Sequence, residues 1–141
     1  MARALRLWGP PVLYALAIFI SSSQSVVPSP PGPLSDKHVH GLAYAGLALT
    51  ILRALAGGAW SAVTYACAWR AGLLAVAYGA TDEWHQSFVA GRDPSLADLG
   101  ANTVGVAVAV VAVVALARLI RRDTRVDATI ERSAGRVGQT P

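Results

Sequence analysis

The sequence predicts an all-α membrane protein in which four transmembrane helices form a bundle and both termini are cytoplasmic. Hydrophobic residues make up 54% of the 141-residue chain and charged residues only 14%, which is too apolar for an ordinary soluble domain of this length. Four apolar stretches alternate with polar segments. Ten of the twelve Lys and Arg residues lie before the first stretch, between the second and third, or after the fourth. The positive-inside rule assigns these segments to the cytoplasm.

The segments on the opposite, outward side carry most of the acids and all of the histidines. The only basic residues there are Lys37 and Arg92. Although the net charge is +4, the basic residues sit at span ends, which favours contact with membrane lipids and not with nucleic acid. We therefore expect a multi-pass protein of the cell membrane with an outward polar cluster. Its members are Asp36, His38, His40, Asp82, Glu83, His85, Asp93 and Asp98.

The first apolar stretch runs from Leu7 to Ile20 after two arginines, with Pro10 and Pro11 in its first turn, where a missing amide hydrogen costs little. A secretory signal has a similar pattern, and cleavage is the alternative interpretation. We expect a retained helix, because no clean small-x-small cleavage site follows. Residues 24–35 contain four prolines and predict an outer loop.

The second and third stretches differ in length. The second runs from about Lys37 to Leu55, close to the roughly 20 residues that a bilayer requires. Between Arg70 and Asp82 there are only eleven uncharged residues, which cover about half of a hydrocarbon core of roughly 30 Å. Since Arg70 can reach inward from a helix end, the acids are expected at membrane depth, facing protein or a water-filled cleft.

The fourth stretch runs from about Leu96 to Leu116 and carries small residues at every fourth position. Ala101, Gly105 and Ala109 predict a face that another helix can approach closely, including a helix of a second copy in a homo-oligomer. We assign residues 1–119 to the four-helix domain. Residues 120–141 are polar without apolar periodicity, and we expect a disordered cytoplasmic tail.

His40 is a candidate acid or base at the outward end of the second helix. Asp36 lies four residues before it and Tyr44 four residues after it, so that all three share one helix face. A carboxylate that orients an imidazole is a common arrangement in acid–base catalysis. The alternative is that Asp36 serves as the N-cap of the helix.

Asp82 and Glu83 are the other candidate catalytic residues. They lie near the C-terminal end of the third helix, where the backbone dipole is already negative, so that Lys37, Arg92 or proton uptake must compensate them. Gln86 lies four residues after Asp82, on the same face. The alternative is a salt-bridge cluster that only holds the helices together.

Three further residues complete the candidate substrate-binding set. Arg92 either binds a phosphate or carboxylate or is a solvated loop charge. Asp98 follows Ser95 by three residues and either joins the site or forms a capping box. Asn102 needs a hydrogen-bond partner in an apolar helix. The full set of candidate binding residues is Asp36, Lys37, Tyr44, Gln86, Arg92, Asp98 and Asn102.

No cofactor or metal site is predicted. His38 and His40 are two residues apart and point in nearly opposite directions on a helix, so that they cannot share an ion. The sequence also lacks His-Glu-x-x-His, a Gly-rich phosphate loop and a nucleophile elbow.

The order of these motifs resembles the VanZ-like family of bacterial membrane proteins over residues of about 8 to 116. The motifs are Asp36-Lys37-x-x-His40-x-x-x-Tyr44, Asp82-Glu83-x-x-Gln86-x-Phe88, Gly91-Arg92, Ser95, Asp98 and Asn102-x-x-Gly105. Ala90 departs from the family pattern, which commonly has Pro there. The resemblance implies a small multi-pass envelope protein, whose named relative is associated with resistance to the glycopeptide antibiotic teicoplanin, and it implies no known reaction.

Three functions remain open from the sequence. The first is an enzyme-like site at the outer face for an envelope lipid, a lipid-linked cell-wall intermediate or a glycopeptide, with His40 and Asp82 or Glu83 as acid and base. The second is a non-catalytic binder, or a scaffold for a partner protein. A proton-coupled transporter is the third, for which four short helices leave little room.

Overall fold

The computed structural model describes residues 1–25 and 35–137, with side chains to residue 122. Within these residues the protein is all-helical and has no strand, which confirms the predicted all-α class. Two segments, Ala2–Ser22 and Leu96–Arg122, are long and apolar enough to cross a membrane. The helices are α1 (Ala2–Ser22), α2 (Asp36–Leu55), the short 3-10 helix η1 (Trp60–Ala62), α3 (Tyr65–Gln86) and α4 (Leu96–Val137).

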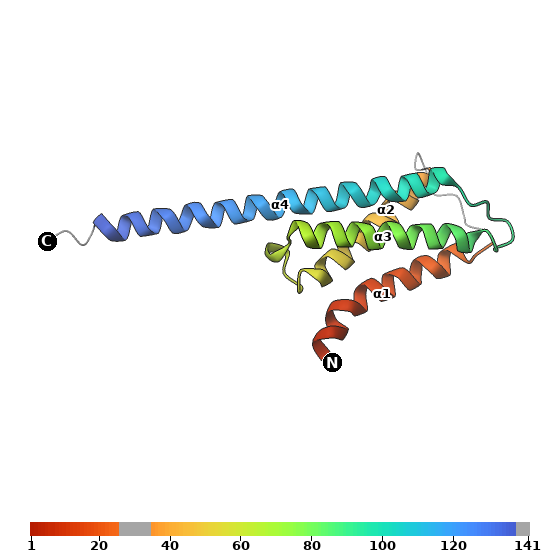
Figure 1. The fold of residues 1–141 in the computed structure, drawn as a ribbon, viewed down its shortest axis with the longest axis horizontal. Helices are drawn as coiled ribbons and strands as arrows, with labels where there is room; N and C mark the ends of the chain where they lie inside the picture. The colour runs from red at the N-terminus through yellow and green to blue at the C-terminus, as the bar shows by residue number, and fades with distance from the viewer. Residues whose placement is uncertain (26–34, 138–141) are drawn as a thin grey trace.

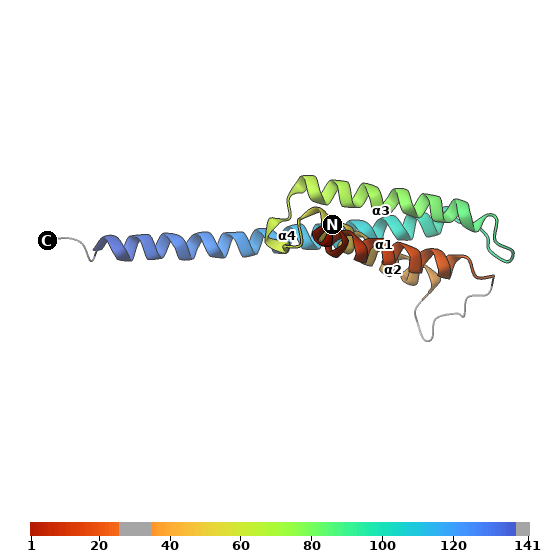
Figure 2. The ribbon, with the colours of Figure 1, turned by 90° about the horizontal axis from the view of Figure 1, so that it is seen from below.

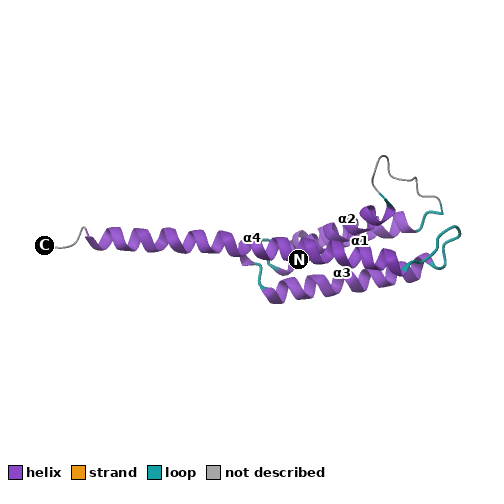
Figure 3. Cartoon of the chain, turned by 90° about the horizontal axis from the view of Figure 1, so that it is seen from above, coloured by secondary structure: helices purple, strands orange, loops and turns teal. Residues whose placement is uncertain are grey.

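The helices pack side by side, and α4 extends far beyond the other three (Figures 1 and 2). The C-terminal ends of α1 and α3 lie at the same end of the bundle as the N-terminal ends of α2 and α4 (Figure 3). We call this the site end and the opposite one the basic end. Of the outer loop predicted over residues 24–35, residues 26–34 lie outside the described residues.

Helix α2 is the centre of the bundle and packs closely against α4. A side-chain carbon on Gly105 would overlap the backbone carbonyl of Gly41, and one on Gly41 would lie 3.3 Å from the carbonyl oxygen of Ala101. The predicted close approach along the small residues of α4 is therefore confirmed, and the approaching helix is α2 of the same chain. A homo-oligomer through Ala101, Gly105 and Ala109 stays a prediction. The buried residues of α2 are Tyr44, Leu47, Ala48, Ile51, Leu52 and Ala54.

Helix α1 is only lightly packed, and its buried residues are Pro11 and Ser22. Tyr14 packs over Gly46 of α2, where any side chain would overlap its ring. Tyr78 of α3 donates a hydrogen bond of 2.7 Å to the carbonyl oxygen of Ala15. A polar contact therefore adds to the apolar packing of Tyr14, Ala15 and Ile18 in holding α1 in place.

The expectation of a disordered tail is wrong for residues 120–137, because α4 continues to Val137. Residues 106–134 contain neither Gly nor Pro, and a helix nucleated in the apolar span extends with one hydrogen bond for each added residue. Where α4 leaves the bundle, Arg121 donates to the carbonyl oxygens of Ser61 and Val63, each at 2.9 Å. The last part of the predicted tail, residues 138–141, lies outside the described residues.

Candidate functional site

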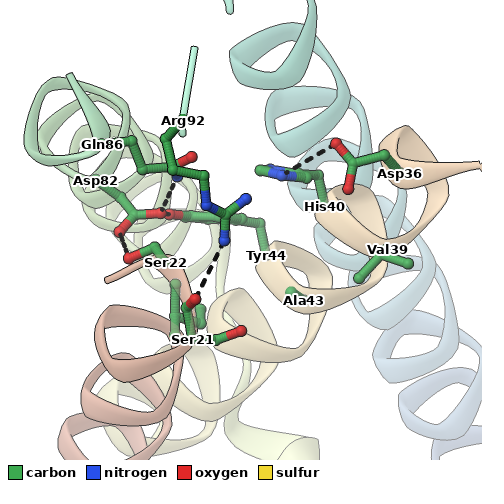
Figure 4. Close-up of a pocket in the computed structure, with 11 residues that line it drawn as sticks. Ser21, Ser22, Asp36, Val39, His40, Ala43, Tyr44, Asp82, Gln86 and Arg92 are labelled. Carbon is green, nitrogen blue, oxygen red and sulfur yellow. Dashed lines mark hydrogen bonds and ion pairs between the residues drawn. The ribbon is translucent and has the colours of Figure 1, made fainter. Parts of the chain in front are cut away.

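A cavity of about 100 Å³ lies at the site end, between α1, α2, α3 and the segment that joins α3 to α4 (Figure 4). Its apolar wall includes Ile18, Val39 and Ala43. Six of the predicted site residues line it, although they come from three separate stretches of the sequence. They are Asp36, His40, Tyr44, Asp82, Gln86 and Arg92.

Asp82 accepts three side-chain hydrogen bonds in the cavity and is only 4% exposed. Its carboxylate accepts hydrogen bonds from Ser22 Oγ at 2.6 Å, from the Tyr44 hydroxyl at 3.0 Å and from Gln86 Nε2 at 3.1 Å. These neutral donors offset the cost of taking the carboxylate out of water. Lys37 and Arg92, which were expected to compensate this carboxylate, instead contact Asp98 and the carbonyl oxygens of Ser21 and Gln24. Proton uptake, the third expected compensation, stays a prediction.

Arg92 reaches across the cavity from the segment between α3 and α4 (Figure 4). Its Nε donates to the carbonyl oxygen of Gln24 at 3.0 Å and its Nη2 to that of Ser21 at 3.1 Å. Gly91 has a φ of 79°, and a side chain there would come within 2.9 Å of the Ser25 carbonyl oxygen. The glycine thus lets the turn pass close to the end of α1 and carries the guanidinium to the cavity.

Asp36, His40 and Tyr44 lie along one face of α2, as predicted, and all three line the cavity. His40 Nε2 is 3.7 Å from Asp36 Oδ2. The proposed N-cap role of Asp36 is wrong, because Ser35 is the N-cap and Asp36 is the first helical residue. His38 instead accepts the Ser35 backbone N–H at its Nδ1, at 3.1 Å, and so helps to cap the helix.

Glu83 does not line this cavity and instead joins α3 to the start of α4. Its Oε2 accepts the backbone N–H of Ser95 at 3.0 Å. In the predicted capping box, the Asp98 carboxylate would have accepted this N–H. Its Oε1 is buried without a hydrogen-bond partner and lies 3.9 Å from His40 Nδ1, which is also buried and unpartnered. Glu83 is therefore both a structural cap and a neighbour of the imidazole.

Lys37 and Asp98 pair with each other at 3.0 Å and do not line the cavity. Asn102, one turn along α4 from Asp98, is completely buried, and neither of its side-chain polar atoms has a hydrogen-bond partner. A side-chain carbon on Gly79 would lie 3.5 Å from Asn102 Nδ2. The predicted partner of the Asn102 amide is thus not found among the described residues.

Two features of the site did not emerge from the sequence. Ser22 supplies a donor to Asp82, and its only signal was a hydroxyl at the end of an apolar stretch. The spacing of His38 and His40 predicts no metal site, whereas ligand atoms of Asp36, His40 and Asp98 lie within 4.8 Å of one another. The spacing of His38 and His40 does not bear on this set.

Comparison with known proteins adds no assignment. No family model, no curated protein and no solved structure matches this chain.

Proposed function

We propose that this chain is a four-span cell-membrane protein of the VanZ-like kind, with both termini in the cytoplasm. Its cavity at the outer face would bind the anionic headgroup of an envelope lipid or of a lipid-linked cell-wall intermediate. The observation that carries the proposal is the convergence of Arg92, His40 and Tyr44 on one cavity with an apolar wall. A guanidinium offers five N–H donors, of which two are used here, so that donors remain for a phosphate.

The distribution of charge between the two ends supports this orientation. At the basic end, Arg3, Arg6 and Arg53 surround a second cavity of about 420 Å³. A cluster of arginines beside a membrane span is typical of the cytoplasmic side, where anionic headgroups lie. Asp36, Asp82 and the other candidate site residues lie at the opposite end, which corresponds to the outward face.

The contacts of α1 support its retention as the first span. Ser22 bonds to the buried carboxylate of Asp82, and the carbonyl oxygens of Ser21 and Gln24 accept bonds from Arg92. Removing α1 as a signal peptide would leave Asp82 without its shortest hydrogen bond and would remove one wall of the cavity. A cleaved segment has no need for such specific contacts with the remaining chain.

The size of the cavity favours a headgroup over a whole antibiotic. Pockets that enclose a drug-sized ligand measure roughly 300–1,000 Å³, whereas this cavity measures about 100 Å³. It fits a phosphate and a few attached atoms, with the remainder of the ligand in the surrounding lipid. We therefore favour an envelope lipid over a glycopeptide as the ligand.

Binding fits the geometry better than catalysis by Asp82, because that carboxylate already accepts three hydrogen bonds. An acid–base role is the second candidate and falls on the other pair. His40 Nδ1 and Glu83 Oε1 face each other at 3.9 Å without other partners, and ligand binding can shorten such a contact. If this pair is catalytic, Glu83→Gln abolishes turnover while lipid binding persists.

The test compares wild type, Arg92→Ala and the matched control Arg70→Ala, which removes an exposed arginine of α3 outside the cavity. Each protein is purified in mild detergent, and its bound lipids are identified by native mass spectrometry. Because a charge-assisted bond contributes about 1.5–3 kcal/mol, we expect Arg92→Ala to lower phosphate-lipid affinity by about 10- to 100-fold.

A deletion strain complemented with the same variants reports on the lipid in cells. We expect one envelope lipid or cell-wall precursor to change in the deletion and Arg92→Ala strains and to return to normal with Arg70→Ala. Membrane levels of each protein show that the variants accumulate normally. Equal lipid affinity of wild type and Arg92→Ala would refute the proposal.

A further inference from the structure

Beside the cavity, three metal-ligating side chains from two helices come together. Asp36 and His40 lie one turn apart on α2, Asp98 is in the first turn of α4, and one ligand atom of each lies within 4.8 Å of the other two. Zn²⁺ bonds of roughly 2.0–2.2 Å place tetrahedral ligand atoms about 3.4 Å apart. His40 Nε2 and Asp36 Oδ2, at 3.7 Å, are already near that spacing. The Asp36 side chain is 60% exposed and is free to rotate toward an ion.

The close crossing of α2 and α4 is the reason that these side chains meet. Gly41 and Gly105 allow backbone contact between the two helices. Asp36 and His40 precede this crossing on α2, and Asp98 precedes it on α4, so that their side chains share the space above the contact. The arrangement is part of the helix packing and does not depend on a flexible loop.

The second nitrogen of His40 adds an independent indication of a ligand. With Nε2 toward Asp36, Nδ1 faces Glu83 Oε1 at 3.9 Å, and both atoms are buried without a hydrogen-bond partner. Metal-bound histidines commonly donate their other N–H to a carboxylate, which fixes the ring and strengthens the ligand. Glu83 is itself held in place by the Ser95 backbone N–H.

The charge of the cluster also favours a cation. Asp36, Asp98 and Glu83 contribute three carboxylates. Among the residues whose side chains the structure describes, Lys37 is the one lysine or arginine that pairs with any of them, at 3.0 Å to Asp98. The Lys37 side chain is 56% exposed, and exposed ion pairs are weak. A divalent ion can therefore displace the ammonium group from Asp98.

We propose that Asp36, His40 and Asp98 bind a divalent transition-metal ion of the Zn²⁺ class, with Glu83 orienting the imidazole. One imidazole and two carboxylates form a mixed nitrogen and oxygen set that suits Zn²⁺. Three protein ligands leave a coordination position open, and a headgroup oxygen could occupy it on the side of the cavity that Arg92 lines. Only this last step rests on the proposed function, because metal binding itself needs no lipid.

The experiment uses the full chain, purified through a tag without histidines and stripped with a chelator. Zn²⁺ is titrated by calorimetry, with Mn²⁺ as a second probe. We expect one Zn²⁺ per chain and at least a tenfold loss of affinity in His40→Ala and in Asp98→Asn. Loss of a carboxylate that orients a metal-bound histidine typically lowers metal affinity 10- to 100-fold. We expect a loss of this size for Glu83→Gln.

Two control variants separate this site from general metal binding. His85→Ala removes a histidine at the same end of the bundle that contacts Phe19 and Ser23, and it should bind Zn²⁺ as wild type does. Lys37→Gln removes the competing cation and should bind at least as tightly as wild type. Absence of Zn²⁺ binding at millimolar concentration, or equal affinity in wild type, His40→Ala and Asp98→Asn, would overturn the proposal.

The metal and lipid proposals fail in different ways. If the stripped and the Zn²⁺-loaded proteins bind phosphate lipid equally well, the ion does not contact the headgroup and the lipid proposal stands. If Zn²⁺ binds with the expected variant pattern but Arg92→Ala leaves lipid affinity unchanged, the metal site stands alone. X-ray absorption of the Zn²⁺-loaded protein checks the ligands directly, and a spectrum without one imidazole would contradict the site.

Discussion

The bond between Tyr44 and Asp82 gives the sharpest test of the buried network. Tyr44→Phe removes one hydroxyl from a side chain that is 1% exposed and leaves the ring in place. The Asp82 carboxylate then loses the donor at 3.0 Å and keeps Ser22 and Gln86. Hydrogen bonds to charged groups contribute about 1.5–3 kcal/mol, so that we expect the free energy of unfolding to fall by about 2 kcal/mol.

Tyr78→Phe is the matched control, because the Tyr78 hydroxyl donates to a neutral backbone carbonyl, that of Ala15, at 2.7 Å. Side-chain hydrogen bonds between membrane helices average about 0.6 kcal/mol, and we expect a loss of that order. Both variants are unfolded with increasing SDS in mixed micelles and followed by circular dichroism and tryptophan fluorescence. A loss in Tyr44→Phe no larger than in Tyr78→Phe would refute the view that the Tyr44 hydroxyl is a main support of the buried Asp82 side chain.

Two further predictions test the helix packing and the placement of α1. Gly105→Ala forces the new methyl group onto the Gly41 carbonyl and should destabilise the fold by about 1–3 kcal/mol. The control Gly100→Ala meets no atom within 4 Å and should be neutral or stabilising by up to about 1 kcal/mol. Unfolding of both variants in SDS measures the difference. Ser22→Ala removes the 2.6 Å bond to Asp82 and should speed protease cleavage near the end of α1 at unchanged membrane level, and an unchanged cleavage rate would contradict the role of this bond.

The helix boundaries were predictable from the sequence where the apolar stretch ends next to a helix-breaking Gly or Pro. The start of α4 at Leu96 and the end of α2 at Leu55 agree with the sequence prediction. The extension of α4 to Val137 was not predicted, because apolar periodicity reports on burial, and a helix that leaves the bundle needs none. The absence of Gly and Pro over residues 106–134 was the sequence signal that would have indicated this extension of the helix.

The site was predictable as a set of residues but not as a set of contacts. Helix spacing placed Asp36, His40 and Tyr44 on one face, and the structure agrees. Spacing within one helix says nothing about which partner lies opposite, so that the donors of Asp82 and the cap formed by Glu83 required the packing of α1 and α4. For the same reason, the spacing of His38 and His40 could not reveal a set of ligand atoms that includes Asp98 on another helix.

The light packing of α1 explains why the polar site and the fold depend on each other. In the membrane location that we propose, an apolar helix with two buried residues gains little specificity from hydrophobic contact, since lipid is as apolar as protein. The bonds from Ser22 to Asp82, from Tyr78 to Ala15 and from Arg92 to the end of α1 supply the specificity instead. Arg92, which would bind a headgroup, therefore also fixes the first helix. A substitution at Arg92 has to be judged by bound lipid and by the unfolding of the bundle together.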